Sequence, residues 1–594
     1  MVAQANAGAL DPRIADLPNI KPSADLNENL LSSLEIMLHC KERDMCYRIP
    51  AVTITGHVDS GKSTTTVCTL YEMGSFTDKQ IEDAAATPKG LATLVEAGKE
   101  AKERGVTIET RVWRVALPNT LKLKDQAKID KAKDMLQKLG IQFEEKKEGD
   151  VTIIDYSTPL DIVDCPGHKD YLPNTCGAIT EAQEQLVLFP GGSGAKQSGE
   201  ASNADDNDAA FGHAISDKST SLAHARLGIA NRNSMVFCLS KCDSNSSDTN
   251  SSRVLSLVQS IKKTFGIKED NMAVIPIANA SRRAHNIVRK SDADFMKFFN
   301  GQTFVKYLND YRDANHIGYP TKISITSAFD SLRYRLPQVC IEGTHYNRGC
   351  CVAVKKIVNK AGHGNIIVGV VISGALRVGA VLTSCEHDIK LSVVTMEQFR
   401  KSVNLSATGA HIGIKLKVST DSGKKGLSEK SITEGDLLYC DYPKDQTPKC
   451  VQYVKASMLF FKSKDNVQHD LGSGGMYISG SKHAVTICRV VKMEQTSKVI
   501  NKQTKKREIE LSKNSEGQIG RWSSGSKLKA WLKFSTPECL VTINQCVFGA
   551  SGPYLTHKNP TAAVKIVKLI NDKAKIERTE ADLKKYRTTK KKKE

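Results

Sequence analysis

The sequence lacks the features of a membrane or secreted protein. No run of 18 apolar residues occurs among its 594 residues, which excludes an ordinary transmembrane helix. Residues 1–27 are polar and mixed in charge, without the basic start and apolar core of a secretory signal. The spacing C-x-x-C is also missing, so the 16 cysteines form no paired zinc-ligand motif and are predicted to be buried thiols. We therefore expect a cytoplasmic protein with no membrane partner and no zinc site.

The sequence also has fewer acidic residues than basic ones. Lys and Arg number 85 against 65 Asp and Glu, which gives a net charge of +20. Such an excess favours a polyanionic partner, such as nucleic acid or the ribosome, over a merely soluble basic protein. Part of the excess lies in residues 584–593, a lysine-rich stretch that is typical of a disordered tail.

One glycine-rich stretch carries most of the functional information. Residues 56–66 have the sequence GHVDSGKSTTT, which matches the phosphate-binding pattern G-x-x-x-x-G-K-[ST]. The β-branched run at 49–55 predicts a strand before it, and residues 64–71 predict a helix after it. The backbone N–H groups of such a loop and the helix N-terminus bind phosphate oxygens. The predicted phosphate-binding residues are Gly56, His57, Val58, Asp59, Ser60, Gly61, Lys62, Ser63, Thr64 and Gly167.

Three residues are predicted to hold Mg²⁺ beside the phosphates. Ser63 offers a hydroxyl at the start of the helix. Asp164 ends the hydrophobic strand predicted at 151–163, where a carboxylate can hold the magnesium shell. Thr107 lies between these two motifs and is expected to close on Mg²⁺ and the γ-phosphate only when triphosphate is bound.

The chemistry of hydrolysis is predicted to centre on the sequence DCPGH at 164–168. Gly167 lets its N–H approach the γ-phosphate, while Lys62 reaches the β- and γ-phosphates. His168 then orients the attacking water or supplies positive charge to the transition state. His168 is therefore the candidate catalytic residue.

The base-recognition residues are expected in two later segments. Asp243 can accept hydrogen bonds from guanine N1–H and the 2-amino group, and Lys241 lies against the base. The pattern usually starts with Asn, but here Ser240 stands in that position and can make fewer bracing hydrogen bonds. A last base contact is predicted at Ala278 and Asn279. These residues predict GTP and GDP as ligands, with a preference for guanine.

The chain has two regions with different sequence patterns. From residue 48 to about 335, apolar strands alternate with helical patterns. This alternation predicts an α/β domain with a mostly parallel sheet and helices on both faces. Combined with the phosphate-loop and guanine motifs, it predicts an α/β P-loop GTPase domain. After residue 340, short strands separated by turn residues predict two β-barrel domains. The expected domains are an N-terminal extension at 1–47, a GTP-binding (G) domain at 48–338 with insertions near 120–150 and 190–215, β-barrels at 339–446 and 447–572, and a basic tail at 573–594.

Some individual elements follow from the same patterns. Residues 26–38 and 122–149 predict helices, the second of them inserted before a strand. Strands of the second barrel are predicted at 451–461, 528–534 and 540–548, among others.

Together these motifs resemble the elongation factor 1-alpha family of translational GTPases. The phosphate loop, the sequence KERGVTIE at 102–109 and the sequence DCPGHKDYLPN at 164–174 carry the resemblance, and residues 364–381 resemble strands of the family's second domain. The resemblance implies a monomeric GTPase that uses GTP and Mg²⁺ and delivers aminoacyl-tRNA to the ribosomal A site. A guanine-nucleotide exchange factor would be a further partner. The resemblance also implies that His168 is catalytic and that Asp59 helps to organise the site.

The chain departs from the family pattern at the guanine end and in the last barrel. Ser240, Ala278 and Asn279 differ from the usual residues, and 552–563 lacks the family's Gly-Arg-Phe element. Two alternatives therefore stay open. One is a termination or ribosome-rescue GTPase that delivers a tRNA-shaped protein. The other is a weakly hydrolysing GTP-binding scaffold that binds RNA or acidic filaments.

Overall fold

The chain divides into two compact units, one ending at Glu342 and the other beginning at Gly343. No helix in the described ranges is both long and apolar enough to cross a membrane. The computed structural model describes residues 23, 25–43, 45–58, 60–87, 90–95, 111–168, 172–190, 220–231, 233–240, 259, 274–276, 330–342, 349–360, 364–419, 429–444, 446–461, 468–469, 473–478, 481–500, 507–514, 522–523, 525–542, 546, 550–556 and 559–591.

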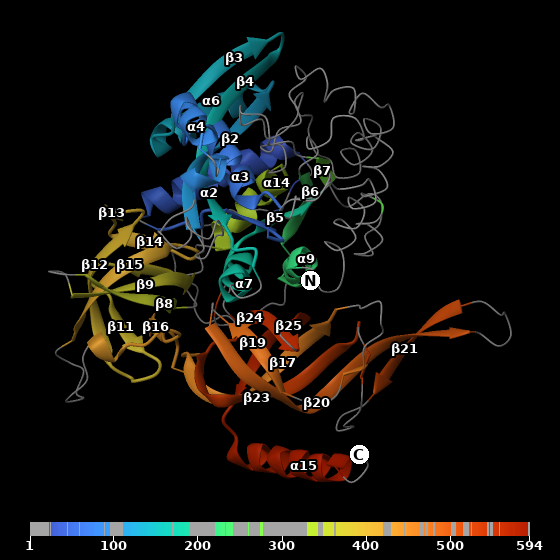
Figure 1. Cartoon of the computed structure of the whole chain (residues 1–594). Helices are drawn as coiled ribbons and strands as arrows, with labels where there is room; N and C mark the ends of the chain where they lie inside the picture. Colours follow the sequence, from blue (N-terminus) through green and yellow to red (C-terminus); the bar gives the residue numbers. More distant parts are fainter. Residues whose placement is uncertain are drawn as a thin grey trace. The chain divides into compact units, whose positions relative to one another are not determined.

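A seven-stranded sheet forms the centre of the first unit (Figure 1). Five of its strands are mutually parallel, as the sequence predicts. The outer strand β2 runs antiparallel to β4 and is not predicted from the sequence. The strand order is β2 (Arg111–Leu123), β4 (Val151–Asp164), β1 (Ala51–Gly56), β5 (Glu184–Pro190), β6 (Ser234–Ser240) and β7 (Val274–Pro276), and β3 (Phe143–Glu148) pairs with the first half of β4.

Helices cover both faces of this sheet. On one face, Val67 and Leu70 of α3 (Lys62–Glu72) pack with buried strand residues that include Ile54 and Leu188. On the other face, Ala178 of α7 (Leu172–Glu181) packs with Val163. The helix α9 (Thr220–Asn231) contacts α7 and strands β1, β5 and β6. The phosphate loop therefore lies between a strand that is buried on both sides and a helix that packs directly onto it.

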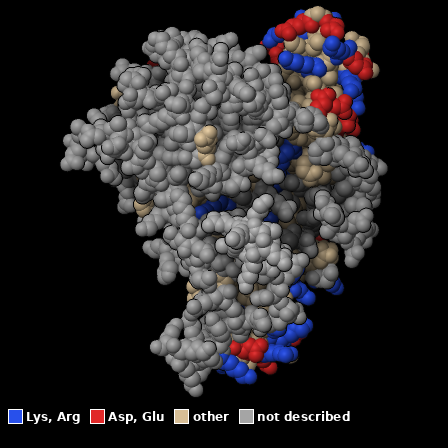
Figure 2. Space-filling view, turned by 90° about the vertical axis from the view of Figure 1, so that its right-hand side faces the viewer, with Lys and Arg blue, Asp and Glu red and all other residues tan. Residues whose placement is uncertain are grey.

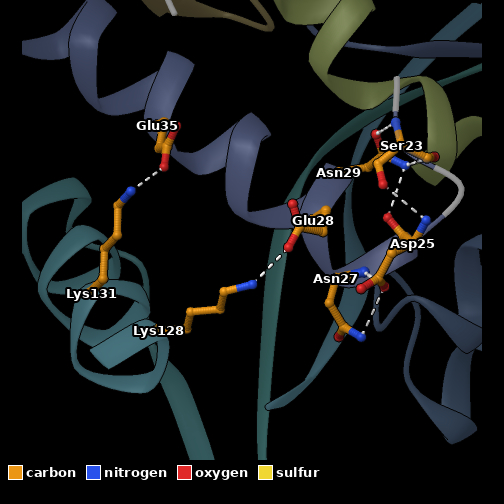
Figure 3. A network of polar contacts seen from close by, with 8 residues as sticks. All are labelled: Ser23, Asp25, Asn27, Glu28, Asn29, Glu35, Lys128 and Lys131. Atoms are coloured by element: carbon orange, nitrogen blue, oxygen red, sulfur yellow. Dashed lines mark hydrogen bonds and ion pairs between the residues drawn. The ribbon is translucent and has the colours of Figure 1, made fainter. Parts of the chain in front are cut away.

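A smaller core lies on the two-stranded ribbon that β2 and β4 form by antiparallel pairing, here called the β2–β4 ribbon. The amino-terminal helix α2 (Leu26–Glu42), the inserted helix α6 (Gln126–Leu139) and Leu336 of α14 (Asp330–Glu342) share it with inward residues of the ribbon. Ion pairs join the exposed sides of α2 and α6, with Lys128 Nζ 2.7 Å from Glu28 Oε1 and a second pair between Lys131 and Glu35 (Figure 3). The predicted helix at 26–38 is confirmed by α2. The inserted helix predicted at 122–149 is confirmed at 126–139 as α6, but residues 143–148 of that range form the strand β3, which the sequence does not predict.

The second unit contains two closed antiparallel barrels, which confirms the predicted fold class. In each barrel a final pairing, β11 with β12 or β19 with β20, closes the ring. The first barrel has the order β11 (Val381–Ser384), β16 (Leu437–Cys440), β8 (Cys350–Lys360), β9 (Gly364–Ser373), β15 (His411–Val418) and β12 (Lys390–Gln398). The second has the order β19 (Ser473–Ile478), β24 (Ser551–Thr556), β25 (Asn559–Ile570), β17 (Lys449–Phe460), β23 (Lys527–Leu540) and β20 (Ser481–Ile500).

One expectation about the second barrel is wrong. The predicted strand at 540–548 does not form at Val541, Thr542 or Cys546, because β23 ends at Leu540. Val541 and Cys546 do not belong to any strand, but their side chains pack in the barrel core. Their apolar character therefore reflects burial and not strand formation. Most described cysteines are buried free thiols, as predicted.

The basic tail is helical through Lys591, and not disordered as its composition suggests. The helix α15 (Lys573–Lys591) has an anchor of Ile576 and Leu583, which pack with the core of the second barrel, and Thr579 between them is buried at helical spacing. Glu580 accepts hydrogen bonds from Tyr453 and Lys533 of that barrel. Because most residues of this helix are charged, the one face that packs is hard to recognise in the sequence.

Candidate functional site

The phosphate loop connects β1 to α3 with the geometry that its sequence predicts. The strand ends at Gly56 and the helix begins at Lys62. Gly61 precedes the helix with φ of +85°, a left-handed conformation that residues with a side chain rarely adopt. The N–H of Thr65 donates to Gly61 O at 2.9 Å, which starts the helix ladder directly behind the loop. The N-terminus of α3 thus lies directly at the loop, where the first backbone N–H groups of a helix can bind anions.

Lys62 places a buried cation inside this loop. Its side chain is only 7% exposed, and Nζ donates to His57 O at 2.6 Å. A Cβ built on Gly167 would collide with Nζ and Cε of Lys62, so the segment after β4 approaches the phosphate loop closely at this point. His168 follows directly, and its side chain is exposed. The structure therefore brings Lys62 together with Gly167, the residue that directly precedes the candidate catalytic residue His168.

Asp164 and Ser63 have the chemistry of a magnesium site. Asp164 is completely buried and accepts a hydrogen bond from Thr66 Oγ1 at 3.2 Å. Ser63 and Thr66 are three residues apart on α3 and therefore share a face of the helix. Ser60 Oγ is buried and has no hydrogen-bond partner among the described residues, as expected of a hydroxyl that serves a ligand. One hydroxyl and one carboxylate suit Mg²⁺, which completes its shell with water and phosphate oxygens.

A second set of hydrogen bonds, not predicted from the sequence, supports the loop from α9. The N–H of His57 donates to Ser221 Oγ at 2.7 Å, and the Ser221 hydroxyl donates to Leu188 O at 3.1 Å. His57 Nδ1 lies 2.6 Å from Thr220 Oγ1. In the sequence, the signal for this role is a Ser or Thr at the start of a helix. Ser and Thr are equally common there as simple helix caps, so the signal does not predict the contact.

His224 of α9 is buried behind the loop. Both ring nitrogens have no hydrogen-bond partner among the described residues. Burial, together with the nearby charges of Lys62 and His57, lowers the pKa of His224 from 6.5 to about 3. The imidazole is therefore neutral at physiological pH and leaves Lys62 as the loop's cation.

This burial predicts a pH dependence of stability. The unfolded chain binds a proton at His224 below pH 6.5, whereas the folded chain does so only near pH 3. The free energy of unfolding should therefore fall as the pH falls through this window, by about 1.4 kcal/mol per unit at most. Denaturant unfolding at pH 7 and at pH 5 measures how much the free energy of unfolding decreases between the two pH values. In His224→Leu this decrease should be smaller than in the wild type by about 2 kcal/mol.

The control for this experiment is His168→Gln, which changes an exposed histidine and should follow the wild type. Equal pH dependence of His224→Leu and wild type would contradict the assignment of the effect to His224.

The guanine side of the site is only partly described. Ser240 ends β6, is 1% exposed, and donates from Oγ to Phe189 O at 3.3 Å. A Cβ on Gly61 would lie 3.9 Å from Ser240 Cβ, so this serine packs behind the phosphate loop. Its hydroxyl thus bonds to the neighbouring strand β5. The predicted site residues Asp59, Thr107, Lys241, Asp243, Ala278 and Asn279 lie outside the described residues.

Comparisons with known proteins agree with this geometry. Residues 47–332 match the family model of the elongation factor Tu GTP binding domain. Elongation factor 1-alpha of Desulfurococcus mucosus is 23% identical over 396 residues, which cover 65% of this chain and 69% of that protein.

A solved structure shares the fold at low identity. The S. cerevisiae Ski7 GTPase-like domain, bound to GTP, matches with a TM-score of 0.53 and 13% identity over 90% of this chain and 99% of that one. A bacterial selenocysteine-specific elongation factor, EF-Sec, matches 91% of this chain at 13% identity with a TM-score of 0.44, and this chain spans 62% of its length. Residues 47–332 thus match an elongation factor Tu-type GTP-binding domain, and the chain is a distant relative of elongation factor 1-alpha.

Proposed function

We propose that this protein hydrolyses GTP in order to deliver aminoacyl-tRNA to the ribosomal A site. The observation that supports hydrolysis most directly is the close approach of Gly167 to Lys62, beside the buried carboxylate of Asp164. A phosphate cradle, a magnesium ligand and the segment that carries a candidate catalytic histidine meet there. This set of groups is what phosphoryl transfer to water requires.

Each residue of the site has a defined task in the proposed reaction. The backbone of 56–63 and the Lys62 ammonium bind the phosphates, while Ser63, Asp164 and Thr107 would hold Mg²⁺. When bound, the metal would supply positive charge beside the phosphates. The Gly167 N–H donates to the γ-phosphate, and the exposed ring of His168 orients the attacking water.

The proposed partners fit the remaining architecture. Lys241, Asp243, Ala278 and Asn279 would select guanine. Two closed barrels provide rigid surfaces for aminoacyl-tRNA, and the net charge of +20 suits RNA and the ribosome. An exchange factor would replace GDP with GTP on a monomeric, cytoplasmic protein.

A filter-binding experiment with labelled aminoacyl-tRNA tests the delivery role. Binding should be at least about tenfold tighter with a non-hydrolysable GTP analogue than with GDP, because the switch alters the tRNA surface. Deacylated tRNA is the control for recognition of the aminoacyl end. Equal binding in both nucleotide states would contradict delivery, and recovery of a release-factor-like protein without tRNA would support the rescue alternative.

His168→Ala is expected to lower ribosome-stimulated GTP hydrolysis on the order of a hundredfold, since a positioned proton-transfer or water-orienting group contributes at least that much. GTP affinity should change little, because the phosphate cradle is intact. Phosphate release measured with excess ribosomes gives the rate. His387→Ala, in the first barrel, is the matched control and should hydrolyse GTP like the wild type.

A second candidate function, a weakly hydrolysing GTP-binding scaffold, is favoured by Ser240. Its hydroxyl bonds to β5, where the usual asparagine would brace the phosphate loop with more hydrogen bonds. A wild-type hydrolysis rate that ribosomes do not raise, and that His168→Ala does not lower, would select this alternative.

A further inference from the structure

Cysteine, and not charge of one sign, is concentrated at one place in the described part of the chain. Figure 2 shows blue and red side chains interspersed at the upper end of the molecule, where Figure 1 draws β3 and β4. Thiols, in contrast, meet where the two barrels pack together. Cys351 of the first barrel and Cys546 of the second belong to one apolar core, against which Cys385 and Cys539 pack. The junction of the barrels therefore holds thiol chemistry that GTP hydrolysis does not use.

Two thiols of the second barrel lie side by side and connect this junction to the surface. Cys450 on β17 is directly opposite Cys539 on β23 in the antiparallel pairing of the two strands. The Cα atoms of opposed antiparallel residues are about 4.5–5.5 Å apart, which is within the span of a disulfide. Cys450 is exposed to solvent, whereas Cys539 is partly buried. A reagent in solution can therefore reach the first thiol of the pair directly.

A third thiol, from the first barrel, lies beside this pair. Cys385 directly follows β11, and its side chain forms a hydrogen bond with that of Cys539. Asp436 holds the two segments together, because its Oδ1 accepts from Cys539 Sγ at 3.7 Å and from the N–H of Glu386 at 3.1 Å. Cys539 also forms a side-chain hydrogen bond with Cys450. It therefore has one thiol neighbour in its own barrel and one in the other barrel.

The surroundings keep these thiols protonated. Burial and the thiol of Cys539 raise the pKa of Cys450 to about 11, and the carboxylates of Glu386 and Glu538 raise it further. The hydrogen bond from Cys385, together with burial, raises the pKa of Cys539 well above its usual range. A thiol with a raised pKa attacks slowly at neutral pH, but it is also a poor leaving group once it is part of a disulfide. This chemistry suits a slow and persistent oxidation.

We propose that Cys450, Cys539 and Cys385 form an oxidation site that reacts with small-molecule disulfides and ends in a disulfide between the two barrels. The Cys450 thiolate attacks the small disulfide RSSR, which forms a mixed disulfide and releases one RSH. Cys539 then attacks the Cys450 sulfur and releases the second RSH. Cys385 attacks the Cys539 sulfur, which links the barrels and returns Cys450 to a thiol. In sum, two protein thiols become one disulfide and RSSR becomes two RSH.

The test treats the full chain with oxidised glutathione at pH 8, alkylates the remaining thiols and identifies the linked peptides by mass spectrometry. The expected product has a disulfide between Cys385 and Cys539 and an alkylated Cys450, and dithiothreitol reverses it. The link closes a loop of about 150 residues, from 385 to 539. The unfolding temperature of the barrels should therefore rise by about 5 °C or more on oxidation.

Single variants separate the entry thiol from the final link. Cys450→Ser should form the inter-barrel disulfide about tenfold or more slowly, because the exposed thiol that meets the reagent is gone. Cys385→Ser should stop at a disulfide between Cys450 and Cys539. Cys46→Ser, which removes a partly exposed thiol of the other unit, is the matched control and should react like the wild type. In the wild type the rate should rise about tenfold per pH unit between about pH 7 and 9, as the thiolate fraction of Cys450 does below its pKa.

A wild-type product that stops at glutathione on Cys450, or at a disulfide between Cys450 and Cys539, would overturn the proposal. So would an inter-barrel disulfide that forms equally fast in Cys450→Ser. If a serine variant does not fold, alanine at the same position provides the same comparison without a hydroxyl at the junction.

Discussion

Replacing Lys62 with alanine is expected to weaken GTP binding about a thousandfold. The buried ammonium lies inside the phosphate loop, donates to His57 O, and is in reach of both the β- and γ-phosphates in the proposed complex. Hydrogen bonds to charged groups contribute about 1.5–3 kcal/mol each, so the loss of two corresponds to a factor of roughly 10² to 10⁴. Titration of a fluorescent GTP analogue measures the change.

The matched control is Lys131→Ala, which removes an exposed lysine that pairs with Glu35 on α2. This variant should bind GTP like the wild type. Lys62→Arg should also bind weakly, because Gly167 and His57 O leave no room for a guanidinium group. Equal GTP affinity of Lys62→Ala and Lys131→Ala would contradict the assigned role.

Arg114→Ala is expected to lower the free energy of unfolding by about 3 kcal/mol. Arg114 on β2 forms two hydrogen bonds to Asp161 on β4, at 2.7 and 2.8 Å. Removal of the guanidinium leaves a carboxylate that is only 4% exposed without its cation. Breaking one side of a buried pair is costly because the remaining charge is left in a poorly solvated place.

Denaturant unfolding of both single variants and of Arg114→Ala/Asp161→Ala measures this pair. The double variant should be more stable than the sum of the single losses predicts, since no charge is left uncompensated. The surface pair Lys124–Asp150 is the matched control, and Lys124→Ala should cost less than about 1 kcal/mol. Additive losses at Arg114 and Asp161 would contradict a coupled pair.

The sequence predicts the strand, loop and helix around the phosphate loop well because the information for them is local. Gly61, Lys62 and Ser63 are consecutive, and a glycine-rich turn between a strand and a helix has few alternative conformations. The parallel strands and the barrels are likewise predicted from short apolar runs and turn residues. In each case the information lies within a few residues of the element that it specifies.

The elements that the sequence does not predict depend on distant partners. Ser221 supports the phosphate loop from 164 residues away, and Arg114 finds Asp161 across 47 residues. Buried and exposed side chains alternate along β2, as in a half-buried strand. Its pairing with β4 depends on the core that α2 and α6 form with these two strands. The helix of the basic tail packs on the barrel through Ile576 and Leu583, which composition does not reveal.

The core shared by α2, α6 and α14 has a consequence for synthesis of the chain. Leu30 and Leu336 meet there although about 300 residues separate them, an interval that takes the ribosome roughly 15–60 s to translate. Throughout that time the nascent amino-terminal helix has its apolar face without α14. Chaperones that protect exposed apolar helices are therefore expected to engage this protein while it is still attached to the ribosome and to release it once residues 330–342 have emerged.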